Sequence, residues 1–115
     1  MKYDVEKIRN AFQSNFVFYT THSREEMESE EFGVISDSEI FEAVLSAEII
    51  EEYPNDKPYP SCLLFGTTST RRPLHIVCGI ENNYEEVVVI TAYHPNPSGG
   101  LITNKGGNNE VCDLP

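Results

Sequence analysis

Residues 71–95, RRPLHIVCGIENNYEEVVVITAYHP, contain two apolar segments separated by an Asn-Asn pair at residues 82–83. The first segment, residues 74–80, alternates between one uniformly apolar face and a second face that carries His75. This alternation is typical of a half-buried strand. The second segment, residues 87–90, is apolar on both faces, as in a strand inside a sheet. We therefore expect two adjacent strands, with His75 pointing away from the more apolar face.

Three helices are predicted ahead of these strands. Residues 4–14 repeat apolar side chains at helical spacing. Residues 23–31 and 36–48 each begin with an S/T-x-x-E pattern, the capping box that starts a helix, with Ser23 and Ser36 as the caps. The last of the three helices should bury an apolar stripe formed by Ile40, Phe41, Val44 and Leu45.

Short runs of β-branched, aromatic and aliphatic residues predict strands at residues 16–21, 49–53 and 61–66, and His22 follows the first of them. Helices followed by a meander of strands indicate an α+β fold. In such a fold the helices would pack on one face of a mainly antiparallel sheet of four to five strands. Each strand can then pair with its neighbour in the sequence.

The length of 115 residues allows one domain with a modest core. We expect residues 1–95 to form this domain and residues 96–115 to form a tail rich in Gly, Asn and Pro. No run approaches about 20 apolar residues, and the first residues lack the apolar segment of a signal peptide, so we expect a cytoplasmic protein with no membrane contact. Cys62, Cys78 and Cys112 form no CxxC pair, which predicts reduced thiols and neither disulfides nor a zinc knuckle.

Negative charge is concentrated in one region of the chain. The net charge is −11, and residues 22–52 contain 11 acidic residues against Arg24 alone, a local net charge of −10. A field of this sign repels the phosphate backbone of a nucleic acid. The charge therefore disfavours RNA as a ligand and favours a basic protein partner.

Four side chains could form a site that cleaves RNA without a metal, a reaction that needs a base, an acid and a cation for the phosphate. His22 or His75 could be the base or the acid, because imidazole titrates near neutral pH. Arg72 could hold the phosphate, since its planar fork matches two phosphate oxygens, and Tyr93 could donate a hydrogen bond. Against this stands a structural role for each residue, at a strand end or on the surface, which is the more frequent role of titratable groups on small domains.

A metal site is also chemically feasible. His22, His75 and His94 could bind zinc, because three imidazoles and an open position suit this ion. Their spacing shows no HxH, HxxxH or HExxH pattern, and the chain has no Walker loop, GxGxxG or nucleophile elbow. The sequence therefore predicts neither a metal ion nor another cofactor.

The order of the sequence blocks resembles a known family. The blocks are IIEEYP at residues 49–54, LLFG at residues 63–66, RPLHIV at residues 72–77 and VITAYHP at residues 89–95. Over about residues 21–95 the chain resembles the bacterial and archaeal family called domain of unknown function 4258. That family is similar to the small RelE-like and BrnT-like toxin ribonucleases. The resemblance implies a RelE-like or barnase-like fold, a metal-independent ribonuclease site and an antitoxin-like protein partner.

The chain also departs from this family. Its members carry an Arg before Met27 and a basic residue before Gly33, where this chain has Glu26 and then Glu31 and Phe32. Related sequences also continue into a tail with Trp and Arg, which is replaced here by Gly, Ser and Asn. Both departures remove positive charge from where RNA would lie, so the activity could be lost. The alternative function is a non-enzymatic acidic interaction module that forms a homo-oligomer or binds a basic partner.

Overall fold

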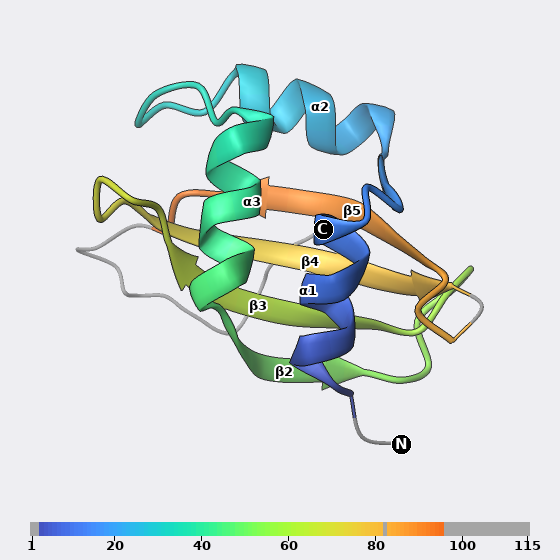
Figure 1. The fold of residues 1–115 in the computed structure, drawn as a ribbon. Helices are drawn as coiled ribbons and strands as arrows, with labels where there is room; N and C mark the ends of the chain where they lie inside the picture. Colours follow the sequence, from blue (N-terminus) through green and yellow to red (C-terminus); the bar gives the residue numbers. More distant parts are fainter. Residues whose placement is uncertain (1–2, 82, 96–115) are drawn as a thin grey trace.

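A computed structural model describes residues 3–81 and 83–95, and the tail predicted for residues 96–115 lies outside this range. The elements in chain order are α1 (Val5–Gln13), β1 (Val17–Tyr19), α2 (Thr21–Glu28), α3 (Asp37–Ser46), β2 (Glu48–Tyr53), β3 (Ser61–Thr67), β4 (Pro73–Glu81) and β5 (Glu86–Tyr93). Figure 1 shows the helices beside one five-stranded sheet. The predicted α+β fold with a mainly antiparallel sheet is confirmed.

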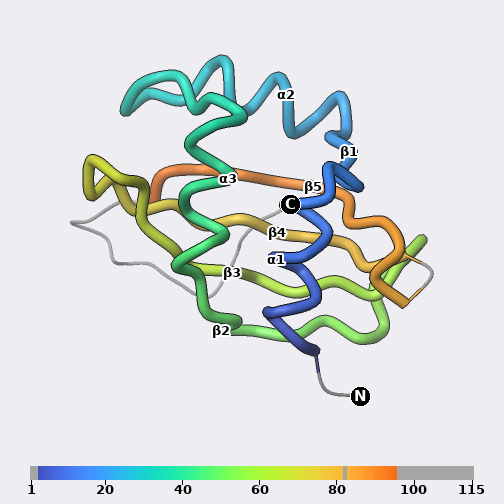
Figure 2. The backbone as a smooth tube through the Cα atoms, viewed as in Figure 1, coloured from blue at the N-terminus to red at the C-terminus, as the bar shows by residue number. Residues whose placement is uncertain are grey.

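The strands of the sheet follow the order β1-β5-β4-β3-β2, and the tube in Figure 2 traces this path. β2 to β5 form an antiparallel meander, as predicted. β1 does not pair with its neighbour in the sequence, because it lies parallel to β5, with Val17 opposite Val87 and Tyr19 opposite Val89. α2 and α3 separate β1 from β2 and carry the chain from one edge of the sheet to the other.

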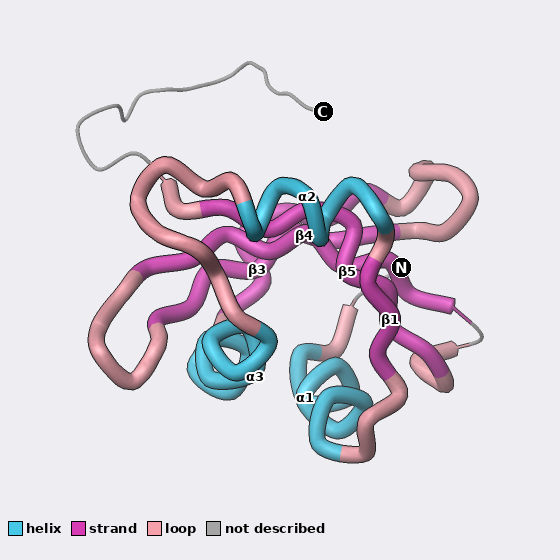
Figure 3. Tube along the Cα trace, turned by 90° about the horizontal axis from the view of Figure 1, so that it is seen from above, coloured by secondary structure: helices cyan, strands magenta, loops and turns pink. Residues whose placement is uncertain are grey.

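α1 and α3 lie side by side on one face of the sheet (Figure 3). Buried Ile8 from α1 and Ile40 from α3 join Leu64 and Ile76 from the sheet in one hydrophobic core. Neither α1 nor α3 covers the opposite face of the sheet. None of the helices in the described part of the chain has the length and apolar composition that crossing a membrane requires.

The apolar stripe predicted for α3 is only half buried. Ile40 and Val44 are fully buried, as predicted, but Phe41 is 36% exposed and Leu45 is 40% exposed. Each exposed residue follows a buried one in the sequence, and successive residues of an α-helix are rotated by about 100° around the helix axis. This rotation turns Phe41 and Leu45 from the sheet toward the space between α3 and β1.

The caps of the helices match the sequence prediction at α3 and differ at α2. The box at Ser36 and Glu39 is formed as predicted. The box predicted at Ser23 is wrong, because the Thr20 side chain caps α2 by accepting the Ser23 N–H at 3.0 Å. His22 therefore lies in the first turn of α2 and not at the end of a strand.

α2 runs along the part of the β5 edge that β1 leaves free (Figure 1). The Glu26 carboxylate accepts the Ala92 N–H at 3.0 Å, and the Glu30 carboxylate accepts the His94 N–H at 3.0 Å. One side chain from α2 and one from just beyond its end thus replace a neighbouring strand. Unpaired N–H groups of an edge strand favour unwanted association, so this arrangement protects the sheet.

Candidate functional site

His75 and Tyr93 face each other across β4 and β5. Their neighbours Ile76 and Ala92 belong to the core beneath α1 and α3, so alternation along the strands places His75 and Tyr93 on the other face of the sheet. Their rings are 5.3 Å apart between centroids, and His75 Nδ1 lies 3.2 Å from the Tyr93 hydroxyl. Phe65 on β3 continues the row, with its ring edge-on to His75 and 5.6 Å away. The structure thus brings two predicted site residues into contact and adds an aromatic neighbour.

Burial lowers the pKa of His75 below its usual value, because a charged imidazolium is poorly solvated there. The ring is therefore mainly neutral at pH 7. A neutral imidazole of this kind can act as a general base. Cleavage of RNA would also need a cation beside the phosphate.

Arg72, the predicted cation, is directed toward α3 and the loop before it. Its Nη1 donates to the Glu39 carboxylate at 3.1 Å and to Val34 O at 3.0 Å. Its Nη2 donates to Phe32 O and Gly33 O. The side chain is 15% exposed. Both terminal nitrogens are therefore bound within the protein and cannot hold a phosphate as well.

His22 is exposed in the first turn of α2. Burial raises the pKa of Glu26, and the hydrogen bond from the Ala92 N–H, together with the nearby His22, partly opposes this effect. Of the four predicted site residues, the structure brings His75 and Tyr93 into contact and places His22 and Arg72 with other partners.

The third histidine contacts another aromatic ring, and two of the cysteines are buried. The His94 ring stacks on Phe32 with centroids 4.8 Å apart. Cys62 and Cys78 are free buried thiols, and burial raises the pKa of Cys62 to about 12. Cys112 lies outside the described residues. Within residues 3–81 and 83–95, no group of three or more His, Cys, Asp or Glu side chains is placed to hold a metal ion.

Most arginines of the chain are held in ion pairs. The three pairs are Arg9 with Glu6, Arg24 with Asp37, and Arg72 with Glu39. They use three of the four arginines in a chain whose net charge is −11. An approaching nucleic acid would meet few free cations and a repulsive field.

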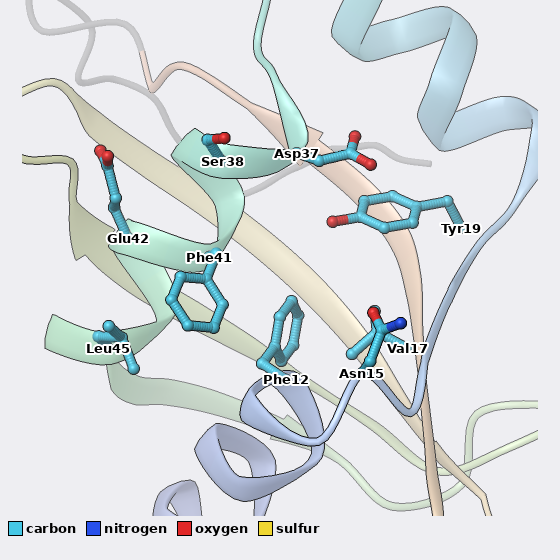
Figure 4. Close-up of a pocket in the computed structure, with 9 residues that line it drawn as sticks. All are labelled: Phe12, Asn15, Val17, Tyr19, Asp37, Ser38, Phe41, Glu42 and Leu45. Atoms are coloured by element: carbon cyan, nitrogen blue, oxygen red, sulfur yellow. The ribbon is translucent and has the colours of Figure 1, made fainter.

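A groove of about 520 Å³ lies between the end of α1, β1 and α3 (Figure 4). Its apolar lining is formed by Phe12, Val17, Phe41 and Leu45. Asp37 and Glu42 of α3 add carboxylates, and Tyr19 of β1 lies beside Asp37. Burial, with a contribution from Asp37, raises the pKa of Tyr19 to about 12, so its hydroxyl stays neutral. We call this feature the α3–β1 groove.

The α3–β1 groove was not predicted, because the helical spacing of Phe41 and Leu45 indicates core positions. A signal was present, since a helix that docks on a sheet buries a narrow stripe, and these residues widen that stripe on one side. Phe16 and Phe18 gave a second signal as aromatic residues in a very short strand segment. They are 56% and 54% exposed.

Comparisons with known proteins give one match. The family model described as Domain of unknown function (DUF4258) matches residues 19–94, which run from the end of β1 to just beyond β5. No curated protein and no solved structure matches the chain. The family match covers well over half of the 115 residues and agrees with the resemblance seen in the sequence blocks. The chain therefore belongs to the family named domain of unknown function 4258.

Proposed function

We propose that this protein is a cytoplasmic, non-enzymatic interaction domain that binds a basic protein segment in the α3–β1 groove. One observation carries the proposal: apolar side chains that the α3 helix could have buried stay exposed along a groove. Phe41 and Leu45 line the groove and are 36% and 40% exposed. Exposed apolar groups that gather in one place are typical of a surface that binds a partner.

The charge of the surrounding helices selects the kind of partner. α3 and all of α2 except Thr21 lie within residues 22–52, where the local net charge is −10. Arg24 offsets Asp37 at the groove and is the one basic residue of that region. A second copy of the chain would bring the same negative charge, so a basic partner is favoured over a homo-oligomer. The family resemblance suggests an antitoxin-like protein as the source of the basic segment.

The proposal predicts selective, salt-dependent binding of a basic extended peptide. A fluorescent peptide of about ten residues that alternates lysine and valine should bind, since it matches the apolar lining and the negative field. Fluorescence anisotropy would follow binding between about 50 and about 200 mM salt, where charge attraction weakens. A glutamate–valine peptide and a single-stranded RNA oligonucleotide are the controls and should not bind. Tight RNA binding with a steep salt dependence, and no binding of the lysine–valine peptide, would contradict the proposal.

A metal-independent endoribonuclease is the second candidate, because one observation favours it. The His75 imidazole is largely neutral, and its Nδ1 lies 3.2 Å from the Tyr93 hydroxyl. In this function His75 would be the base and Tyr93 a hydrogen-bond donor. Incubation with RNA should leave the RNA intact if the protein is an interaction domain. Cleavage that disappears in a folded His75→Ala variant would instead favour the ribonuclease.

A further inference from the structure

β1 is an edge strand, and one of its two main-chain sides faces away from the sheet. Phe16 O accepts the Val87 N–H at 3.1 Å, and Thr20 N–H donates to Val89 O at 3.1 Å. The Phe16 C=O and the Thr20 N–H thus point toward β5. The main-chain groups of successive residues in a strand point to opposite sides, so the direction of the residues between Phe16 and Thr20 follows from this alternation. The N–H and C=O groups of Val17 and Tyr19 therefore point away from β5.

The same two residues contribute side chains to the α3–β1 groove. β1 and the apolar lining of the groove thus lie next to each other (Figure 4). On the other face of the strand, Phe16 and Phe18 are 56% and 54% exposed. Proteins usually protect an edge strand with charged residues, proline or a covering element. Here β1 carries exposed aromatic residues instead.

We propose that β1 binds an extended segment of the basic partner by strand addition, with alternate apolar side chains of that segment entering the α3–β1 groove. This inference rests on the proposed function and specifies how the same groove is used. Main-chain hydrogen bonds to Val17 and Tyr19 would hold the segment, and Phe12 and Leu45 would receive its apolar side chains. Lysine or arginine at the remaining positions would meet the negative field of α2 and α3.

Two other occupants fit less well. A second copy of the chain could pair β1 with β1, but each copy offers three residues and brings a further charge of −11. A helix in the groove would use the apolar lining and leave the outward groups of Val17 and Tyr19 without a protein partner. An extended basic segment satisfies the main chain, the apolar lining and the charge together.

A proline at position 17 tests the main-chain contact. Val17→Pro removes the outward N–H and keeps an apolar side chain, and proline is tolerated on an edge strand where its nitrogen faces solvent. Val17→Ala is the matched control, since it shortens the side chain and keeps the N–H. In anisotropy titrations with the lysine–valine peptide, Val17→Pro should weaken binding by about tenfold or more, and Val17→Ala by less. Thermal unfolding of both variants would show that the fold is intact.

Modified peptides test the same contact without changing the protein. One lysine–valine peptide is N-methylated at its valines and the other at its lysines, so that each loses the N–H donors of one edge. Strand addition predicts that one modified peptide binds like the parent and the other fails. Equal binding of both, or full binding by Val17→Pro, would overturn strand addition and leave the proposed function standing. If the wild type does not bind the parent peptide, the proposed function fails, and strand addition fails with it.

Discussion

Replacing Arg72 by methionine should lower the free energy of unfolding by about 2 to 3 kcal/mol. The substitution leaves Glu39 and the carbonyls of the loop before α3 without their donor, and breaking a largely buried pair costs several kcal/mol. We expect a loss of only about 2 to 3 kcal/mol, and not more, because the Glu39 side chain is 25% exposed and water can partly solvate its charge. Urea unfolding followed by circular dichroism would measure the loss.

Arg71→Met is the matched control, because Arg71 is an exposed arginine next to Arg72 in the chain. It should change stability by no more than about 0.5 kcal/mol.

Burial alone would raise the pKa of Glu39, but the Ser36 N–H and Arg72 outweigh it and lower the pKa below 4.5. The stabilisation by the Arg72–Glu39 pair is therefore present above pH 4.5, and it is lost as the pH falls through the lowered pKa of Glu39. If Arg72→Met lowered the free energy of unfolding at pH 7 by no more than Arg71→Met does, the Arg72 side chain would not be held within the protein and would be free to bind a phosphate.

Replacing Gly66 by alanine should destabilise the protein by about 3 kcal/mol or more. α3 approaches β3 so closely that a Cβ at Gly66 would lie 2.0 Å from Ala43 O and 3.2 Å from the Ala47 Cα. Both are main-chain atoms, so the helix as a whole would have to move away from the sheet. Because α3 forms one wall of the α3–β1 groove, the peptide affinity should fall together with the melting temperature.

Gly79→Ala provides the control for this substitution. Gly79 lies on the neighbouring strand β4. Its added Cβ would lie 3.2 Å from Ile90 Cδ1 and 3.3 Å from Tyr59 Cδ2, which are side-chain atoms that can shift. We therefore expect a smaller loss of stability. Equal melting temperatures for the two variants would show that α3 does not depend on close contact at Gly66.

The strands were predictable because their signal is local. Alternation over residues 74–80 placed Ile76 in the core and His75 on the other face, as the structure has it. Local patterns could not choose between Thr20 and Ser23 as the cap of α2, since both residue types cap helices. A contact between residues distant in the sequence fixes Thr20 as the cap, because the Thr20 N–H also donates to Val89 O on β5.

The candidate site was less predictable, because it depends on contacts between distant parts of the chain. The sequence correctly placed His75 and Tyr93 on adjacent strands, and their side chains meet. It could not show that Arg72 reaches Glu39, a residue 33 positions earlier in the chain. It also could not show that Phe41 faces an open groove, because helical periodicity alone does not reveal where a neighbouring element ends.

The most direct test of the proposed function compares the affinity of two charge-matched variants for the lysine–valine peptide. Leu45→Lys places a cation in the α3–β1 groove, and Ile50→Lys places one at an exposed position, 46% accessible, on β2 at the opposite edge of the sheet. Binding in the groove predicts that Leu45→Lys weakens the peptide complex by about tenfold or more, whereas Ile50→Lys changes it by about twofold at most. Equal affinities for the two variants would contradict the groove as the binding site.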